Sequence, residues 1–461
     1  MSIKAIAIFD IGKSNKKFTL FDFSLRILDQ ECIAFEETED DDGYPCDDLD
    51  GILRWIENTI NKHVKSNTID LSAINFTTYG ASLVHLGDDG KRTTPFYNYL
   101  KPINPELQKD LTSPYGGELA FASDTSSPMM GMLNSGMQLY FLKLQKPDLF
   151  ALISKSVHFP QYLSYLYTGH LLSEYTSVGC HTAMWNMLKQ EYHQWIKDHE
   201  LNDLLPPVFN STESFKADIY DKEIQVGIGI HDSSAALLPY LMIEEKPFIL
   251  LSTGTWSITV NPFNHAHLST IDLKKDCLAF LSTDGEPVRA SRLFLGKEFK
   301  FQVEKIAEYF NCKPAFHQDL AFDAKKCVNV NAKPVHKFKM EFMNAKLHGY
   351  ETPESTDLSQ FESAEIAYYQ LMHELTDMQI SSIRLALGAT SVDKLFIDGG
   401  FSKNDFFVQL LANKLPHLEI VTAEAGMGTT LGAALALKAC HVDKDDLAKQ
   451  FNLRVIHPRK I

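Results

Sequence analysis

The sequence predicts two related α/β domains that face each other across a cleft. The chain has 461 residues, too many for one hydrophobic core and suited to two domains of about 200 residues each. A strand, a short polar turn and a returning strand are expected at residues 3–23 and again at 248–260. Strand-like segments then alternate with segments of helical apolar period in both halves. We place the domains at residues 1–236 and 237–461.

Composition and charge are those of an ordinary globular enzyme. Hydrophobic residues make up 44% and charged residues 22% of the chain. The net charge of −15 and the lack of a basic stripe disfavour binding to nucleic acid or to an anionic membrane. No apolar stretch reaches the roughly 18 residues that span a bilayer. The seven cysteines lie far apart and no leader precedes them, so we expect a cytoplasmic protein with reduced thiols.

In the first half, three apolar runs predict a β-meander. The acidic stretch at 36–50 is interpreted as a solvated loop, with a cation site as the alternative. From 134 to 200 the pattern is mostly helical. The other elements expected here are strands at 3–9, 17–23, 25–35, 72–79 and 82–86, a helical face from 52 to 64, and a short strand that ends at Ile230.

The second half repeats the opening scheme. A long amphipathic helix is expected from about 361 to 388, where Gly388 suits a left-handed helix end. The other expected elements are strands at 248–252, 255–260, 394–397 and 418–422, a helix at 404–414 and a small-residue helix through 432–434.

The first polar turn has the composition of a phosphate-binding loop. Asp10 follows the first apolar run, at a position suited to a phosphate-bound metal ion. The donors of the turn are Gly12, Lys13, Ser14, Asn15 and Lys16. The two lysines are candidates for neutralising phosphate charge, and solvated surface lysines are the alternative.

A carboxylate suited to general base catalysis follows a later strand. Phosphoryl transfer to an alcohol needs donors around the phosphates, a divalent metal and a carboxylate that accepts the hydroxyl proton. Asp232 lies between the strand ending at Ile230 and an apolar helix at 235–240. An aspartate that merely caps this helix is the alternative. His231 beside it is either a structural neighbour or a substrate contact.

Two further turns suit the remainder of a nucleotide. Gly254 and Thr255 form the counterpart of the first turn, and an ordinary hairpin is the alternative. Gly399 and Gly400 follow another strand, where backbone without side chains lets a flat base or a ribose approach closely. A plain strand-to-helix turn explains these glycines equally well. The donors next to them are Ser402 and Asn404.

Other nucleotide and metal motifs fail on inspection. Gly12 to Ser14 resembles the tail of a P-loop, but Ala7 stands where that motif requires glycine. No G-x-G-x-x-G opens a helix after a strand, and no cluster of histidine, cysteine or carboxylate shows the spacing of zinc ligands. Hydride transfer and metallohydrolase chemistry are therefore disfavoured.

Taken together and in this order, the segments resemble the FGGY carbohydrate kinases of the sugar kinase, actin and heat-shock chaperone ATPase superfamily. The resemblance covers nearly the whole chain. It implies two actin-like (ribonuclease H-like) domains that bind ATP and Mg²⁺ in the cleft between them. The family motifs lie here at 10–17 for phosphate and metal (Asp10), 229–232 for the catalytic base (Asp232), 252–256 for phosphate and 399–404 for adenosine.

Within the family the chain is most similar to kinases of deoxyketohexoses such as L-rhamnulose and L-fuculose, above all at 160–176. Ser82 stands where those kinases carry a sugar-binding aspartate, and Met427 stands where they carry a glutamate. The substitution at Ser82 leaves the sugar open. The candidate sugar contacts are Ser82, Gln138, Gln161, His231 and Asp232.

The predicted function is therefore ATP-dependent phosphorylation of a ketose hydroxyl. A pentulose or polyol kinase is one alternative. The other is a non-catalytic, nucleotide-gated interaction protein of the actin or chaperone type. The oligomeric state, a homodimer included, is left open.

Overall fold

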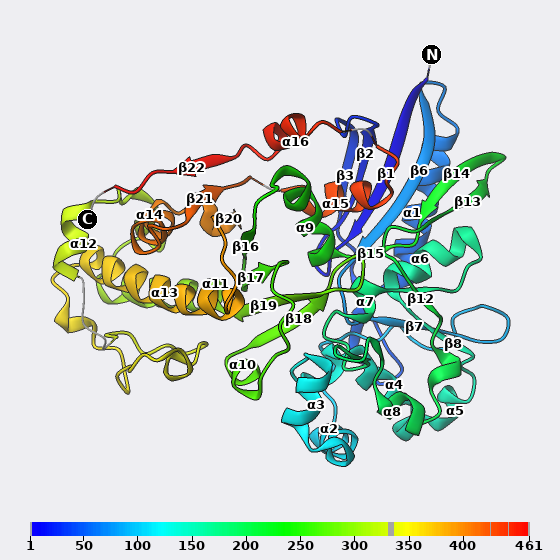
Figure 1. Ribbon diagram of the computed structural model, residues 1–461, viewed down its shortest axis with the longest axis horizontal. Coiled ribbons are helices and arrows are strands. Elements are labelled where there is room, and N and C mark those ends of the chain that lie inside the picture. Colours follow the sequence, from blue (N-terminus) through cyan, green and yellow to red (C-terminus); the bar gives the residue numbers. More distant parts are fainter. Residues whose placement is uncertain (1, 331–335, 425, 441, 460–461) are drawn as a thin grey trace.

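Two mixed sheets, one from each half of the chain, form the frame of the molecule (Figure 1). The structure is a computed structural model that describes residues 2–330, 336–424, 426–440 and 442–459. In these residues each sheet has seven strands. The first sheet runs β13-β14-β6-β1-β2-β3, with β15 also pairing to β6. Its strands are β1 (Ile3–Ile11), β2 (Lys16–Asp22), β3 (Ile27–Ile33), β6 (Ile69–Thr78), β13 (Ser214–Ile219), β14 (Lys222–Gly227) and β15 (Ile230–His231).

The second sheet repeats the opening of the first. An antiparallel hairpin, β16–β17, is followed by strands parallel to β16, and the order is β18-β19-β17-β16-β20-β21-β22. The strands are β16 (Phe248–Thr253), β17 (Ser257–Asn261), β18 (Cys277–Leu281), β19 (Pro287–Leu293), β20 (Lys394–Gly399), β21 (Glu419–Thr422) and β22 (Arg454–Ile456). Strands β1, β16 and β20 contain apolar runs, at 5–9, 248–251 and 395–397, that are buried on both faces of the sheets.

Helices α9 (Asp232–Ile243) and α15 (Gly428–Ala436) lie between the two sheets and pack on each other (Figure 1). Gly432 permits this close approach, because an added Cβ there would lie 1.7 Å from the carbonyl oxygen of Ala235. Asn75 Nδ2 of β6 donates to Ala433 O of α15 at 2.8 Å. One apolar cluster therefore takes residues from both sheets, such as Ile8 and Leu250.

The remaining helices cover the outer faces of the sheets or form a separate lobe in the first half. Long α13 packs on α11 and on the second sheet. The helices are α1 (Leu49–Val64), α2 (Pro105–Thr112), α3 (Glu118–Thr125), α4 (Ser135–Gln145), α5 (Pro147–Phe150), α6 (Phe159–Thr168), α7 (Tyr175–Val178), α8 (Gln194–Asp198), α10 (Thr270–Lys274), α11 (Leu295–Tyr309), α12 (Ala324–Val330), α13 (Ala364–Leu387), α14 (Asp405–Lys414) and α16 (Lys444–Gln450).

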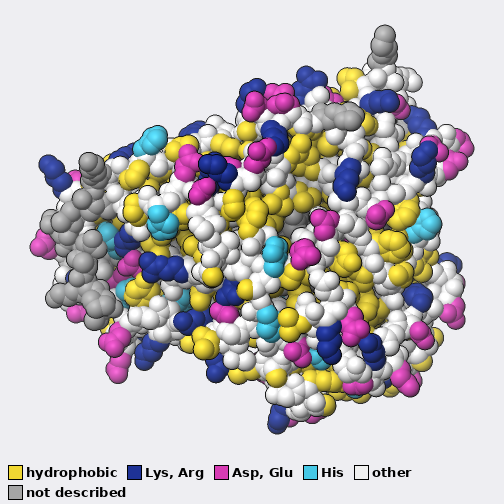
Figure 2. Space-filling view, viewed as in Figure 1, with side chains coloured by type: hydrophobic (Ala, Val, Ile, Leu, Met, Phe, Trp, Pro, Cys, Tyr) yellow, Lys and Arg dark blue, Asp and Glu magenta, His cyan; other side chains and the backbone are white. Residues whose placement is uncertain are grey.

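Short strands join these elements: β4 (Glu37–Glu39), β5 (Pro45–Asp47), β7 (Leu83–Leu86), β8 (Lys155–His158), β9 (Ser173–Glu174), β10 (Trp185–Asn186), β11 (Glu191–Tyr192) and β12 (Val208–Phe209). No helix in the described ranges has both the length and the apolar character needed to cross a bilayer. The face drawn in Figure 2 carries acidic and basic side chains interspersed rather than gathered by sign.

The predicted fold class is confirmed, and so is the repeated strand, turn and strand opening of both halves. The expectation that 134–200 is mostly helical is wrong in part, because β8 to β11 lie within it. Three of these strands have two residues each: β10 and β11 pair with each other, and β9 pairs with the more distant β12. The division placed after residue 236 falls inside α9, between the last strand of one sheet and the first of the other. That division stays a prediction.

Gly399 at the end of β20 provides a test of the close approach between β16 and β20. Its φ is +78°, and an added Cβ would lie 1.9 Å from Thr253 O. We expect Gly399→Ala to lower the free energy of unfolding by more than about 2 kcal/mol in denaturant titrations. Gly43→Ala is the matched control, with φ +75° and no described atom within 4 Å of the added Cβ. It should cost only about 1 kcal/mol. Equal losses in the two variants would contradict the predicted steric clash.

Candidate active site

The carboxyl ends of three neighbouring parallel strands bring the predicted catalytic residues together. In β1 and β6, Asp10 pairs with Thr77, and in β15 and β6, His231 pairs with Thr78. Asp232 follows at once as the first residue of α9. Ligands of open α/β sheets bind at such strand ends. Asp10 and Asp232, 222 positions apart in the numbering, therefore meet at one edge of the sheet.

The two carboxylates oppose each other electrostatically. Burial, and then the charge of Asp232, raise the pKa of Asp10 to about 7, while Lys17 acts in the other direction. Burial likewise raises the pKa of Asp232 to about 6, although its side chain keeps 30% of its surface exposed. Both groups are therefore strained as anions. Such a pair suits Mg²⁺, which prefers carboxylate and water oxygens.

Asp232 is held in place by its immediate neighbours. Its Oδ1 accepts from Ser233 N at 2.6 Å and from Ser233 Oγ at 3.2 Å. His231 Nε2 lies 3.1 Å from the same oxygen. The N-cap of α9 is His231, and α9 has no side-chain capping hydrogen bond among the described residues. The alternative that Asp232 merely caps the helix is therefore not what the structure contains.

His231 is a neutral, buried imidazole. Burial lowers its pKa to about 4, so it carries one ring proton at neutral pH. Its Nδ1 lies 3.1 Å from Ser234 Oγ, and its Nε2 lies 3.1 Å from Cys180 Sγ. The hydrogen-bonding partners of the ring are therefore Ser234 and Cys180, while Asp232 Oδ1 is a close electrostatic neighbour of Nε2.

The first hairpin has the form of the predicted phosphate turn. Gly12 N donates to Asn15 O at 3.0 Å, and the side chains of Ser14 and Asn15 are exposed. Lys13 and Lys16 both bind Asp47, and Lys16 is only 2% exposed. Contacts of these two ammonium groups with phosphate stay predictions.

Lys17 is a further residue of the site that the sequence motifs alone did not identify, although the register of the hairpin was a signal for it. Lys17 pairs directly with Asp10 across β1 and β2. Its Nζ donates to Gly426 O at 3.0 Å, which joins the first hairpin to the loop before α15. A cation therefore lies between the carboxylate and the second half of the chain. Met427, next to that loop, packs against the apolar cluster between the sheets.

Hydrogen bonds connect the turn at Gly254 and Thr255 to the glycine pair at Gly399 and Gly400. Gly254 and Thr255 are exposed at the tip of β16–β17. Thr253 Oγ1 donates to Asp398 O and accepts from Phe401 N at 3.0 Å. One threonine hydroxyl thus fixes the distance between the two predicted nucleotide turns.

Two cavities adjoin these turns. The larger, of about 820 Å³, is lined by Gly254, Thr255, Gly400 and Asn404. The other, of about 560 Å³, is lined by Gly399, Gly400 and Ser402. The structure therefore gathers all six predicted turn residues around adjacent space. Sequence reasoning missed the aromatic and cationic lining of the larger cavity, which is Lys297, Phe299, Lys300, His317, Tyr368, Phe401, Lys403 and Phe406.

The predicted sugar contacts have different surroundings. Ser82 is 2% exposed and follows Ala81, whose φ is +65°. The amide of Gln138 donates to Ala81 O and to Met132 O, and its oxygen accepts from Leu83 N at 3.3 Å. Gln138 thus supports the backbone around Ser82.

Gln161 is tied to the strand end that leads to Asp232. Its Nε2 donates to Gly229 O at 3.2 Å and to Glu174 Oε1 at 3.3 Å. The glutamines at 138 and 161 are both fully committed as donors to protein oxygens. Their contact with a sugar stays a prediction, and their visible role is to shape the backbone.

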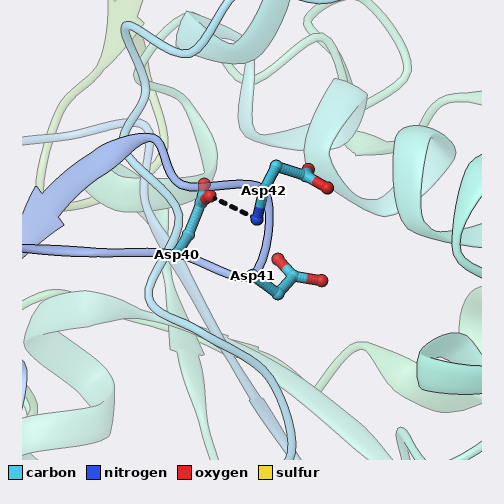
Figure 3. Close-up of side chains that lie close together, drawn as sticks. All are labelled: Asp40, Asp41 and Asp42. Carbon is cyan, nitrogen blue, oxygen red and sulfur yellow. Dashed lines mark hydrogen bonds between the residues drawn. The ribbon is translucent and has the colours of Figure 1, made fainter.

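The acidic stretch is neither solvated throughout nor an open cation site. Figure 3 shows Asp40 turned back to accept from Asp42 N, at 2.9 Å. Lys101 Nζ lies 2.6 Å from Asp40 and 2.6 Å from Asp42. Lys146 pairs with Asp41 at 2.6 Å and with Asp42 at 2.5 Å. Two ammonium groups therefore hold the position that a metal ion would take.

Comparisons with known protein families match nearly all of the chain. Residues 5–238 match the N-terminal domain of the FGGY family of carbohydrate kinases. Residues 245–445 match the C-terminal domain of FGGY carbohydrate kinases.

Curated relatives are similar at low identity. A rhamnulokinase from Oceanobacillus iheyensis is 23% identical over 80% of this chain and 79% of its own length. One from Halalkalibacterium halodurans is 22% identical over 88% of this chain and 87% of its own length.

Solved structures share the fold. A carbohydrate kinase from Novosphingobium aromaticivorans has a TM-score of 0.79 at 23% identity, and 98% of this chain and 96% of that chain are covered. A xylulose kinase from Lactobacillus acidophilus has a TM-score of 0.78 at 17% identity, with coverages of 99% and 94%. Plasmodium falciparum glycerol kinase with ADP has a TM-score of 0.76 at 15% identity, with coverages of 100% and 95%.

The strain on Asp10 predicts a pH-dependent gain in stability when its charge is removed. Because the folded pKa is raised from the model-peptide range to about 7, the folded state binds more protons between these values. The ionised Asp10 carboxylate therefore does not lower the stability of the fold below its unfolded-state pKa, and it lowers that stability by the full amount above its folded-state pKa. In metal-free buffer, Asp10→Asn should therefore raise the melting temperature by a few degrees at about pH 8 and leave it unchanged at about pH 4.

Asp29→Asn is the control of opposite sign. A hydrogen bond from Lys62 lowers the pKa of Asp29, so its charge stabilises the fold at high pH. This variant should have a slightly lower melting temperature than the wild-type protein at about pH 8. A lower melting temperature for Asp10→Asn at that pH would show that the Asp10 charge is not strained.

Proposed function

The chain belongs to the FGGY family of carbohydrate kinases, and we propose that it transfers the γ-phosphate of ATP to a hydroxyl group of a ketose. A deoxyketohexose such as L-rhamnulose or L-fuculose is the proposed acceptor. The low-identity similarity to rhamnulokinases supports this choice. The replacement of the expected aspartate by Ser82 weakens it.

The arrangement of Asp232 is the observation that carries the proposal. Its carboxylate follows the strand ends, near Asp10, and part of its surface is exposed. A pKa of about 6 leaves it ionised at neutral pH and makes it a stronger base than an ordinary aspartate. The hydroxyl proton of the acceptor moves to this carboxylate as the oxygen attacks the γ-phosphorus, and the bond from that phosphorus to the β–γ bridging oxygen breaks to release ADP. The backbone N–H and the hydroxyl of Ser233 orient the carboxylate for that transfer.

The residues around the strand ends are suited to a metal-bound triphosphate. Asp10 would hold Mg²⁺, directly or through water, because burial and the charge of Asp232 disfavour its anion more than Lys17 favours it. When bound, Mg²⁺ gathers the negative charge of the phosphates. Backbone and side-chain donors of the first turn, from Gly12 to Asn15, and the turn at Gly254 and Thr255 would hold the phosphate oxygens. Lys17 supplies a positive charge between Asp10 and the loop at Gly426.

The larger cavity is the proposed adenosine site. Its aromatic lining, which includes Phe299, Tyr368 and Phe406, suits a flat base, and Gly400 leaves room for the ribose. Lys297, Lys300 and Lys403 place positive charge beside it, which a protein of net charge −15 does not supply through its overall field. Exclusion of water by closure of the two halves would protect ATP from hydrolysis.

Two alternatives remain for the experiment to separate. Kinases named for xylulose, gluconate and glycerol share the fold, so a pentulose or polyol is the second candidate acceptor. A nucleotide-gated interaction protein has no need of a carboxylate strained beside the cleft. Family membership and Asp232 both favour the enzyme over that alternative. We also propose a cytoplasmic protein that binds neither nucleic acid nor membranes.

An acceptor panel tests the substrate. Purified protein is incubated with Mg-ATP and separate ketohexoses, ketopentoses and polyols, and ADP release is measured. We expect ADP release with a deoxyketohexose to exceed that with every other acceptor. Preference for a pentulose or a polyol would replace the proposed acceptor. Slow turnover that no sugar accelerates would instead favour the interaction protein.

Asp232→Asn tests the catalytic base. The amide keeps the shape but cannot accept the proton, so kcat should fall by about 10²–10⁴-fold. Nucleotide binding, measured as the rise in melting temperature with Mg-ATP, should stay unchanged. Asp393→Asn is the control, since this exposed aspartate lies before β20, at the end of that strand remote from the nucleotide turns. Wild-type turnover by Asp232→Asn would remove Asp232 from the mechanism.

A further inference from the structure

A carboxylate outside the predicted site joins the phosphate turn to the acceptor side. Asp47 ends β5, and its side chain is 6% exposed. Its Oδ1 accepts from Lys16 Nζ at 2.8 Å. Its Oδ2 accepts from Lys13 Nζ at 2.8 Å and from Tyr79 Oη at 2.8 Å. Three donors from two separate segments therefore share one aspartate.

On the nucleotide side, Asp47 braces the first hairpin. Lys13 and Lys16 lie within and at the end of the turn that follows β1. Lys16 Nζ also donates to Lys13 O at 3.0 Å, so the same ammonium bonds to the turn backbone and to Asp47. The conformation of residues 12–15 consequently depends on where Asp47 holds these two amines.

On the acceptor side, Asp47 fixes the start of the segment that carries Ser82. Tyr79 N donates to Ile11 O at 3.1 Å, and its hydroxyl is bound by Asp47, so the residue is anchored at both ends. Its ring packs against Tyr99 at 5.5 Å and Phe159 at 5.8 Å between centroids. Gly80 and the left-handed Ala81 follow directly. The position of Ser82 therefore follows that of Tyr79.

The electrostatics make Asp47 difficult to replace. Burial opposes its charge, yet the hydrogen bonds from Lys13 and Lys16 outweigh burial and lower the pKa of Asp47. Lys16 is 2% exposed and pairs with this one carboxylate among the described residues. Loss of the Asp47 charge would leave a buried ammonium without its counter-ion, so Lys16 would either lose its proton or move with the turn that carries it.

We propose that Asp47 is a positioning residue that couples the ATP-phosphate hairpin to the acceptor-binding segment, so that its loss weakens the use of both substrates. The inference rests on the proposed function, because the two segments are assigned to ATP and to the sugar there. Asp47 itself touches neither reacting group. It acts through the two lysines on one side and through Tyr79 on the other.

Kinetics with Mg-ATP and the sugar that the acceptor panel selects test the coupling. Asp47→Asn should raise both KM values by about tenfold, since it removes charged hydrogen bonds to both segments. Lys13→Met should raise mainly the KM for ATP, and Tyr79→Phe mainly the KM for the sugar. Asp50→Asn is the matched control: this carboxylate, three residues away, is 60% exposed, pairs with Arg92 and should leave both KM values unchanged.

Hydrogen exchange of the protein alone tests the same coupling without any activity. Tyr79→Phe should speed amide exchange in the hairpin at 12–15, and Lys13→Met should speed it at 79–82, because each variant loosens Asp47. Faster exchange confined to the mutated segment would overturn the coupling, and so would an Asp47→Asn variant that changes only one KM. If no sugar is turned over by the wild-type protein, the proposed function fails, while the exchange results still decide the coupling.

Discussion

Two carboxylates confined at the ends of adjacent parallel strands are the constraint on which the rest of the site depends. Asp10 and Asp232 are fixed by the backbone pairing of β1, β6 and β15, so neither can retreat from the other. Burial and, after it, the charge of Asp232 raise the pKa of Asp10, and burial raises the pKa of Asp232. The fold tolerates this strain because the strands beneath are buried and continuously paired. The same unfavourable environment favours a bound cation beside Asp10 and makes Asp232 a stronger base.

The packing of α9 on α15 connects this strained pair to the nucleotide turns. Asp232 begins α9, and the loop at Gly426 leads into α15. Gly432 allows the two helices to touch backbone to backbone. Lys17 of the first hairpin also donates a hydrogen bond to the Gly426 carbonyl, which precedes α15. A displacement of one half of the molecule relative to the other would therefore move Asp232 and the first phosphate turn together.

Charged side chains of this protein are balanced by neighbouring groups of opposite charge. A net charge of −15 would repel a nucleotide tail, so cations have to be placed where the ligand lies. Lys297, Lys300 and Lys403 line the larger cavity. Acidic residues elsewhere are neutralised by ammonium groups of their own, as the pairs of Lys101 with Asp40 and of Lys13 with Asp47 illustrate. The acidic stretch at 36–50 thus stabilises the fold through ion pairs with lysines and does not form a metal site.

The sequence by itself determined the repeated strand, turn and strand units, the long helix that ends before Gly388, and the order of the motifs from Asp10 to Gly400. These features are local: strand burial, turn chemistry and helix period are written within short windows of residues. Only the tertiary structure decided that Lys16 faces Asp47, that Gln138 donates to the carbonyl of Ala81, and that Lys17 reaches Gly426. Those outcomes depend on partners dozens to hundreds of positions away, and no local pattern encodes which distant group a buried amine or amide will meet.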